Sequence, residues 1–170
     1  KHGKFEYDRA QAEQIAAEIP GAKVALSGGN DPIDQERIGD VADALEAAGL
    51  DVVATTFATV SYSDDSTASL AEQDTFSQVW MSEGATHVLG VGTAATGIAE
   101  AIENNALHDD LTLITGTTGL RTIGGLGTDL SALSMIGVAA EDQFVVGEDG
   151  RYGTDVCLQR IEDELDEVID

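Results

Sequence analysis

The sequence predicts an α/β protein: a doubly wound, mainly parallel five-stranded sheet in the order 2-1-3-4-5, with helices on both faces. Three observations support this fold class. Short apolar runs alternate with longer segments of helical period along the 170 residues. The length and the 42% of hydrophobic residues suit one ordinary domain with a substantial core. The many charged residues fall between the apolar positions, where a folded chain exposes them to solvent.

Five strands are expected where apolar or β-branched runs lie between turn residues. In chain order they span residues 23–26, 51–58, 87–91, 111–114 and 135–139. The run Ser27-Gly28-Gly29-Asn30 has the composition of a turn after the first strand. A helical segment follows each of the first three strands, and the run after the fourth has only a weak helical period. Every parallel crossover needs a helix to cover the sheet. Right-handed crossovers then give the predicted strand order.

Helices are expected where apolar residues recur every three or four positions. They cover residues 7–19, 32–48, 70–83, a segment that begins after Thr93, and 155–170. The second starts at Asp31, with Pro32 at its first position and Asp34 in its first turn. Gly49 suits a left-handed cap at its end, and Gly84 ends the third. The predicted inward faces are Ala12, Ile15, Ala16 and Ile19; Ile38, Val41, Ala42, Leu45 and Ala48; Phe76, Val79 and Trp80; and Ile98, Ala101 and Ile102.

The charge balance excludes several classes of function. Eight basic and 32 acidic side chains give a net charge of −24, and no cluster of Lys and Arg suits a phosphate backbone, so nucleic acid is not an expected partner. No apolar run reaches the roughly 18 residues of a membrane-spanning helix, so no direct membrane insertion is expected. One cysteine, Cys157, excludes an internal disulfide, and the three histidines have no ligand-like spacing, so no metal is expected.

The candidate site consists of loops after three strands. In an open parallel sheet, ligands bind beyond the carboxyl ends of the strands. This rule selects residues 27–31, 92–96 and 115–121, which are rich in small and hydroxyl side chains. The first two loops adjoin helix N-termini, whose free amides favour a carboxylate or carbonyl oxygen. The alternative is that these residues are ordinary turns, because turns also use glycine, serine and threonine.

No motif indicates catalysis. Residues 90–95, Gly-Val-Gly-Thr-Ala-Ala, follow a strand in a G-x-G-x-x-A pattern, but no acid ends the next strand, so no dinucleotide cofactor is expected. The sequence has neither a G-K-[ST] phosphate loop nor a G-x-S-x-G elbow, and Cys157 has no histidine or other base at a recognisable spacing. A protein without catalytic activity or cofactor is predicted. A small flavodoxin-like or Rossmann-like enzyme is the alternative.

Four segments, taken in order, carry a family resemblance. Residues 21–26, 30–32 and 45–53 are similar to a strand, helix start and second strand, and residues 76–89 to the helix, glycine and strand that follow. Together they resemble the second lobe of the type 1 periplasmic-binding-protein family, the extracellular solute-binding proteins of ABC transporters, with the branched-chain amino-acid-binding members as the nearest type. The resemblance covers nearly the whole chain.

The resemblance implies that residues 1–170 are a single α/β lobe, the C-terminal ligand-binding lobe of a protein that traps solute between two lobes. The implied partners are a small-molecule solute, a first lobe missing from this chain, and the membrane permease of an ABC transporter. The implied location is extracellular or periplasmic, with a membrane tether through a missing N-terminal segment. A sensory extracellular domain is the alternative. Without the opposing lobe, the three loops should form an open, concave edge that binds solute weakly.

Eight residues are the candidate ligand contacts. The resemblance places contacts at Gly29, Asn30, Ile33, Thr93 and Thr118, and the loop rule adds Ser27, Asp31 and Thr117. Amino-acid-binding members have an aromatic residue at the position of Ile33, and an acid that holds the ammonium group at the position of Thr118. A buried ammonium without a carboxylate partner is costly, so a neutral, anionic or amide-like solute is as well supported as an amino acid.

Overall fold

The computed structural model describes residues 4–59, 68–91, 95–116 and 133–138, all within one compact unit, Lys1–Val138. The elements are α1 (Lys4–Glu18), β1 (Lys23–Gly29), α2 (Pro32–Ala47), β2 (Asp51–Ala58), α3 (Leu70–Ser82), β3 (His87–Gly90), α4 (Ala95–Asn104), β4 (Thr112–Gly116) and β5 (Met135–Val138). The helix predicted at 155–170 and Cys157 lie outside the described residues. None of the described helices is long and apolar enough to cross a membrane.

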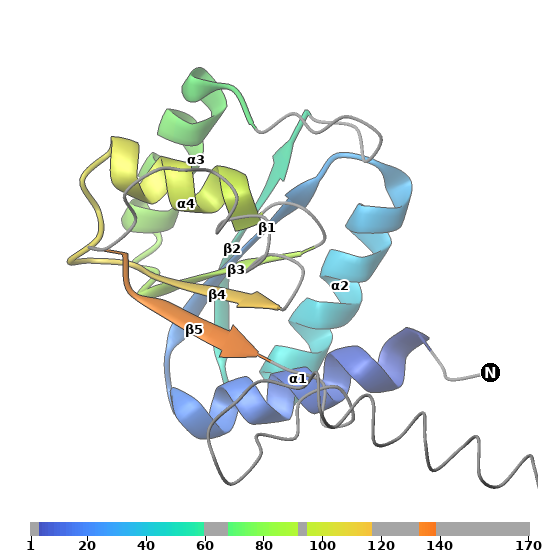
Figure 1. Cartoon of the computed structure of the whole chain (residues 1–170). Helices are drawn as coiled ribbons and strands as arrows, with labels where there is room; N and C mark the ends of the chain where they lie inside the picture. Colours follow the sequence, from blue (N-terminus) through green and yellow to red (C-terminus); the bar gives the residue numbers. More distant parts are fainter. Residues whose placement is uncertain (1–3, 60–67, 92–94, 117–132, 139–170) are drawn as a thin grey trace, which may run out of the picture. The chain divides into compact units, whose positions relative to one another are not determined.

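The five strands form one sheet in the order β2-β1-β3-β4-β5, and every neighbouring pair is parallel. The predicted fold class and strand order are therefore confirmed. β1 lies between β2 and β3, with Val24 aligned to Val52 on one side and to His87 on the other. Because all strands run the same way, their carboxyl ends share one edge of the sheet, as Figure 1 shows.

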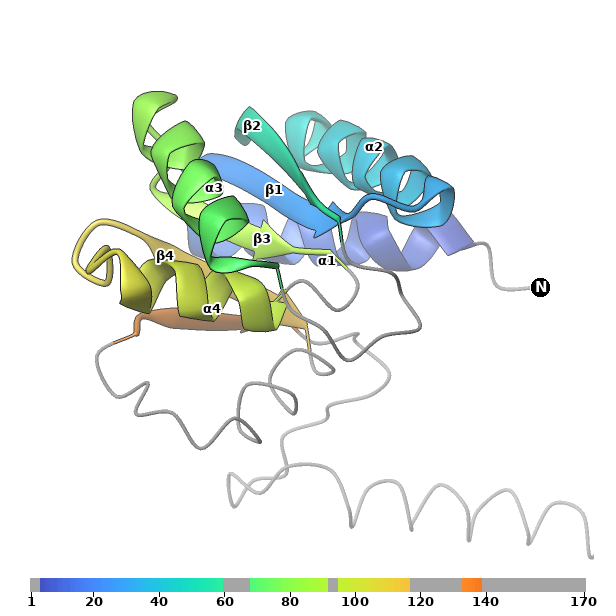
Figure 2. The ribbon, with the colours of Figure 1, turned by 90° about the horizontal axis from the view of Figure 1, so that it is seen from above.

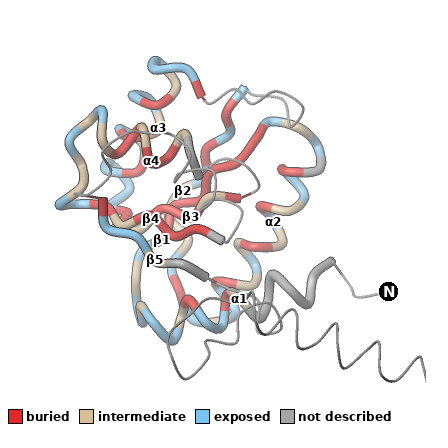
Figure 3. The backbone as a smooth tube through the Cα atoms, in the orientation of Figure 1, coloured by how far each residue is buried: buried red, intermediate tan, exposed pale blue. Residues whose placement is uncertain are grey.

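The helices cover both faces of the sheet, α1 and α2 on one face and α3 and α4 on the other (Figures 1 and 2). Each face has its own buried cluster, one with α1 and α2 and one built around Trp80 of α3 and the inner side of α4. Burial is concentrated where the helices meet the strands (Figure 3). The predicted inward positions of these helices are buried or partly buried, and Trp80 is fully buried as expected.

β1 is longer than predicted, because the glycines assigned to a turn continue the strand. Ser27, Gly28 and Gly29 pair in register with the last residues of β2. A Cβ atom added at Gly28 would lie 2.5 Å from Cδ1 of Ile38 in α2. A side chain at this position would therefore have to displace the end of the Ile38 side chain, because α2 approaches the sheet closely here. The other strands differ from their predicted bounds by no more than two residues.

The helix ends follow the predicted glycines. Gly49 and Gly84 adopt positive φ angles of 92° and 72°. The amide after each glycine donates back over the last turn, Leu50 to the Leu45 carbonyl at 3.0 Å and Ala85 to the Trp80 carbonyl at 2.9 Å. This left-handed cap satisfies carbonyls that the helix leaves free and turns the chain into the next strand.

Candidate functional site

The end of β1 is held on both sides at the carboxyl edge of the sheet. The Val91 amide, just after β3, donates to the Ser27 carbonyl at 2.9 Å. On the other side, the Asn30 amide donates to the Ala58 carbonyl at the end of β2, also at 2.9 Å. These bonds fix the chain where it leaves β1 and enters α2.

Side chains of the loop between β1 and α2 form hydrogen bonds within the loop and fix its conformation. Asp31 caps the helix, because its Oδ1 accepts from the Asp34 amide at 3.1 Å and its carbonyl from the Gln35 amide at 3.0 Å. The Gln35 side-chain amide donates to Oδ1 of Asn30 at 2.7 Å and to the Asn30 carbonyl at 3.3 Å. Asn30 is exposed at the tip of this loop. Its side chain is therefore oriented before any ligand arrives.

Asp34 is a buried carboxyl group at the same edge. Its side chain is 2% exposed, and Oδ2 accepts from the Gly29 amide at the end of β1, at 3.2 Å. The other oxygen, Oδ1, is buried, and no hydrogen bond of good geometry reaches it from the described part of the chain, although the Asp31 side chain lies close enough to affect the pKa of Asp34. Burial raises the pKa of Asp34, and the nearby Asp31 carboxylate raises it further, while the Gly29 amide and Arg37 oppose the rise.

Glu72 joins β2 to the start of α3. Its Oε1 accepts from the Thr59 amide at 2.9 Å and from the Thr59 hydroxyl, and its Oε2 accepts from the Ser69 amide at 2.9 Å and the Ser69 hydroxyl at 2.8 Å. The Ser69 hydroxyl accepts in turn from the Glu72 amide, which completes a capping box. The bonds from Thr59, and then those from Ser69, lower the pKa of Glu72 to about 2.

Sequence reasoning missed the roles of both acids. Asp34 was identified only as a first-turn acid, and Ser69 and Glu72 were not singled out at all. A signal was present in each case, because Asp31 precedes Asp34 by three positions and Ser69 precedes Glu72 by three, the spacing of a capping box. The bonds to Gly29 and Thr59 had no such signal, since they depend on where each strand ends.

The structure brings together Gly29, Asn30 and Asp31 of the predicted contacts. Ser27 is 3% exposed and lies within β1, inside the sheet rather than in the loop. Ile33 lies in the first turn of α2, and its side chain is outside the described residues. Thr93, Thr117 and Thr118 also lie outside the described residues.

Three backbone amides around the start of α2 already have acceptors within the protein. The Asp34 amide is engaged by Asp31, the Gly29 amide by Asp34, and the Asn30 amide by Ala58. These three donors are therefore already engaged within the protein, while the expectation that this helix N-terminus favours a carboxylate oxygen stays a prediction. The corresponding amides before α4 lie outside the described residues.

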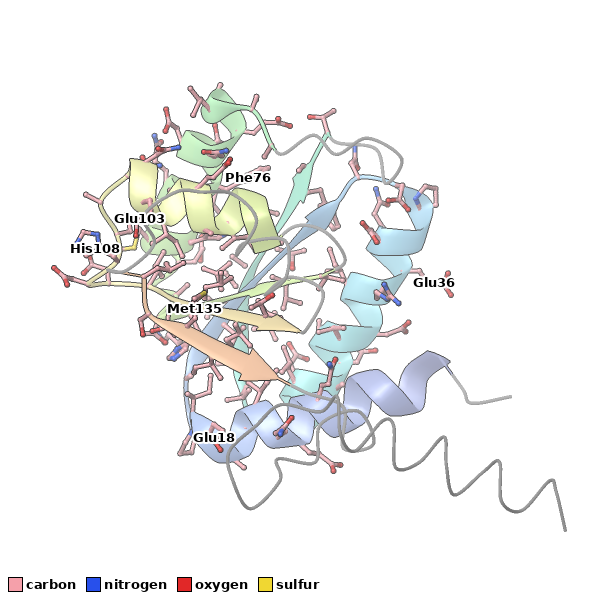
Figure 4. The ribbon with its side chains drawn as sticks, in the orientation of Figure 1. Glu18, Glu36, Phe76, Glu103, His108 and Met135 are labelled. Carbon is pink, nitrogen blue, oxygen red and sulfur yellow. The ribbon has the colours of Figure 1, made fainter. Side chains whose placement is uncertain are left out.

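The described histidines lie at the opposite edge of the sheet. His87 opens β3, where its Nδ1 lies 2.8 Å from the Thr86 hydroxyl and burial lowers its pKa. His108 follows α4 and lies 3.9 Å from Asp109 (Figure 4). Within the described ranges, no group of three or more His, Cys, Asp or Glu side chains could hold a metal ion.

The comparisons with known proteins identify the fold. No protein-family model matches the sequence, and no curated protein matches it. One similar structure is AraP, an arabinose binding protein from Geobacillus stearothermophilus. The aligned region covers 77% of this chain and 44% of the AraP chain, with a TM-score of 0.56 and 17% identity. Another is a periplasmic solute binding protein of an ABC transporter from Actinobacillus succinogenes 130z, with bound D-allose. The aligned region covers 71% of this chain and 42% of that protein, with a TM-score of 0.52 and 16% identity.

A third similar structure is a solute binding protein of an ABC transporter from R. palustris in complex with 4-hydroxybenzoate. It matches 77% of this chain and 44% of its own, with a TM-score of 0.50 and 14% identity. This chain therefore spans less than half the length of these three proteins. At such identities, the similarity establishes a shared fold.

Proposed function

We propose that this chain is one α/β lobe of a solute-binding protein that serves an ABC-type uptake system. The observation that carries the proposal is the fold: a parallel sheet of order β2-β1-β3-β4-β5, similar to ABC transporter solute-binding proteins of which the chain spans less than half. A single lobe of a two-lobe protein accounts for that share. The type 1 family is the subtype that the sequence resemblance favours.

In this proposal the protein binds solute without transforming it. A small polar solute binds first to one lobe, and closure of a hinge brings the carboxyl edge of this sheet onto the solute's exposed side. Asn30, Thr93 and Thr118 would then replace water hydrogen bonds to the solute. Closure is driven only by the contacts that the solute makes in the closed form and lacks in the open form. The fixed position of Asn30 favours such contacts, because little side-chain freedom is lost on binding.

The proposed partners are the solute, a first α/β lobe and a membrane permease. An extracellular or periplasmic location with a membrane tether ahead of this lobe follows from the same role. The complete gene product should therefore encode another α/β lobe before Lys1. An initiator codon directly before Lys1 would contradict the two-lobe proposal and favour an independent domain.

Calorimetry on the two-lobe protein tests the proposed contacts. Arabinose, D-allose and 4-hydroxybenzoate are the first solutes to titrate, since the similar proteins are named for them or hold them bound. Asn30→Ala, Thr93→Ala and Thr118→Ala should each weaken binding by about 1 to 3 kcal/mol, where removal leaves a polar group of the complex unpaired. Glu46→Ala, on the exposed side of α2, is the control.

Thermal melts separate binding from folding in the same set of variants. The melting temperatures should barely change if these residues contact solute. If all three variants bind like the parent, the proposed face is wrong. If all three lower the melting temperature sharply, these residues are structural turns.

A further inference from the structure

We propose that the buried amide of Gln73 couples the connection between β2 and α3 to α4, so that the two loops that enter these helices at the carboxyl edge of the sheet move together. Gln73 lies in the first turn of α3. It is a positioning residue, because it acts through its neighbours and does not itself touch solute. The part of this inference that concerns solute rests on the proposed function, which places the solute at the same edge.

Gln73 is a polar side chain buried between two helices. α3 and α4 lie side by side on one face of the sheet (Figures 1 and 2). Gln73 is 2% exposed, and Ser77, one turn later in α3, is 3% exposed. Both side chains bond to α4, on the face of the sheet that holds the buried Trp80. A buried polar group costs free energy unless it is hydrogen-bonded, so the partners of such a group indicate its role.

Three hydrogen bonds hold the Gln73 amide. Its Nε2 donates to the Ala68 carbonyl at 2.9 Å and to Oε2 of Glu100 in α4 at 3.0 Å. Its Oε1 accepts from Nδ2 of Asn104, also in α4, at 3.0 Å. The Ala68 carbonyl can only accept, so the atom that faces it must be Nε2, and Oε1 is then left to face Asn104. The bonds therefore have one consistent arrangement, and it joins α4 to the residues just before α3.

Ala68 belongs to a connection that is already tied to the first turn of α3. Glu72 accepts from Thr59, just after β2, and from Ser69, the N-cap of α3. Both ends of the connection are therefore bonded to the residue that precedes Gln73. Through Gln73 the same turn is bonded to the middle of α4. Sliding of one helix along the other would break these bonds, whereas apolar contacts alone permit small sliding movements.

A second polar contact between the helices is weaker. The Ser77 hydroxyl lies 3.5 Å from the Ala101 carbonyl, at the outer limit of hydrogen-bond length. It also accepts from Nδ2 of Asn105 at 3.3 Å, but Nδ2 has a shorter bond, of 2.9 Å, to the Ala101 carbonyl within α4 itself. The position of α4 along α3 therefore depends chiefly on Gln73.

The coupling acts on the edge of the sheet where solute is proposed to bind. β2 leads into α3 and β3 leads into α4, so both helices begin at the carboxyl edge (Figure 1). A helix moves nearly as a rigid body. A solute that shifts the start of α4 therefore also shifts Glu100 and Asn104, and Gln73 transmits this movement to the connection that follows β2.

The test compares Gln73→Met with Gln78→Met in the 170-residue chain labelled with nitrogen-15. Methionine has a similar length and helix propensity and fills the site with apolar atoms. The two partners in α4, Glu100 and Asn104, are not fully buried and can bond to water instead, so the variant should fold. Gln78 lies on the exposed side of the same helix and is the matched control.

The first readout is the coupling itself. Ser69→Ala removes the side chain that caps α3 and so disturbs the connection from β2. In the parent, this change should shift the backbone amide signals of residues 98–104 in α4. Ser82→Ala, at the other end of α3, should leave these signals in place. The effect of Ser69→Ala on α4 should be lost in the Gln73→Met background and kept in the Gln78→Met background.

Two results would overturn the coupling. In one, Ser69→Ala shifts the α4 signals equally with and without Gln73. In the other, it shifts none of them in the parent. If Gln73→Met does not fold, judged from the fluorescence of the buried Trp80, Asn104→Ala replaces it. Asn104 is exposed, and its removal takes away one of the two bonds from α4, so the effect of Ser69→Ala on α4 should then be reduced.

The second readout is solute binding by the two-lobe protein. Titration with arabinose should show binding about fivefold weaker for Gln73→Met than for the parent and Gln78→Met, the effect of losing one hydrogen bond, at an unchanged melting temperature. Equal binding by the parent and Gln73→Met would overturn the part of the inference that concerns solute. If none of the three proteins binds arabinose, D-allose or 4-hydroxybenzoate, the proposed function fails, and the first readout alone decides whether Gln73 couples the two helices.

Discussion

Replacing Glu72 by glutamine should destabilise the fold, because this carboxylate ties the end of β2 to the start of α3. Its two oxygens accept from the amides and hydroxyls of Thr59 and Ser69. Glutamine keeps one oxygen and turns an NH2 group toward the other pair of donors. The fall of the Glu72 pKa from 4.5 to about 2 sets an upper limit of about 3 kcal/mol on the stabilisation by its charge. Because the side chain is partly solvated, we expect a loss of about 1 to 2 kcal/mol.

The pH dependence of this loss identifies the charge as its source. The folded-state pKa of Glu72 lies below the unfolded value of 4.5, so its stabilisation is complete above pH 4.5 and is lost as the pH falls through about 2. The difference in free energy of unfolding between parent and Glu72→Gln should be constant near neutral pH and shrink toward pH 2. Urea unfolding can be followed by the emission of Trp80, the only tryptophan, which is fully buried.

Glu83→Gln is the control for the loss of one negative charge from α3. Glu83 follows the last turn of the same helix and is exposed. Its replacement should change stability by less than about 0.5 kcal/mol. If Glu72→Gln is no more destabilising than Glu83→Gln at neutral pH, the four hydrogen bonds do not stabilise the fold as argued. A difference that persists unchanged to pH 2 would show that the lost packing, and not the charge, is responsible.

Three substitutions and one change of salt concentration test the packing and the surface charge. Gly28→Ala should lower the free energy of unfolding by about 1 to 3 kcal/mol, because its Cβ would lie 2.5 Å from Cδ1 of Ile38. Gly39→Ala, which has open space around it, should instead raise the free energy of unfolding by about 0.5 to 1 kcal/mol. Both can be measured by the same urea unfolding. Thr56→Val should cost about 1 to 3 kcal/mol by circular dichroism, since it leaves the buried Trp80 N–H without the acceptor at 3.1 Å. Raising KCl from about 0.1 M to about 1 M should raise the melting temperature, because it shortens the screening length around a chain of net charge −24, and an unchanged or lower value would contradict this.

The fold was predictable because it depends on patterns that are local in sequence. The alternation of apolar runs and helical segments, with right-handed crossovers, was sufficient for the strand order. The place of Trp80 in the core followed from its spacing to Phe76 on one helical face. The extension of β1 through Gly28 was not predictable, because two glycines carry no side-chain pattern and become strand only through pairing with β2 and the approach of α2.

For the candidate site, only the position of the loop in the fold was predictable from the sequence. The rule that ligands bind at the carboxyl edge selected the loop that contains Gly29, Asn30 and Asp31, and the structure places these residues together there. Their hydrogen bonds were not predictable, because an acid in a first helical turn has the same sequence signal whether it faces solvent or bonds to a strand. Asp34 takes the second course, because its carboxylate accepts from the Gly29 amide at the end of β1.

Asp34 and Glu72 both accept a hydrogen bond from a backbone amide at the end of a strand, but they change the free energy of unfolding with pH in opposite directions. Asp34 accepts from the Gly29 amide at the end of β1, and Glu72 from the Thr59 amide just after the adjacent β2. Burial raises the pKa of Asp34, whereas solvated hydrogen bonds lower that of Glu72 to about 2. As the pH falls from neutral, Asp34 takes up a proton first, and this relieves the cost of its buried charge. Glu72 loses its stabilisation progressively as the pH falls from 4.5 to about 2, so the free energy of unfolding should pass through a maximum at an acidic pH above about 2. In Asp34→Asn, the rise in stability as the pH falls from neutral should be smaller, and the fall toward pH 2 should be unchanged. If stability rises as much in this variant as in the parent, other carboxyl groups cause the rise.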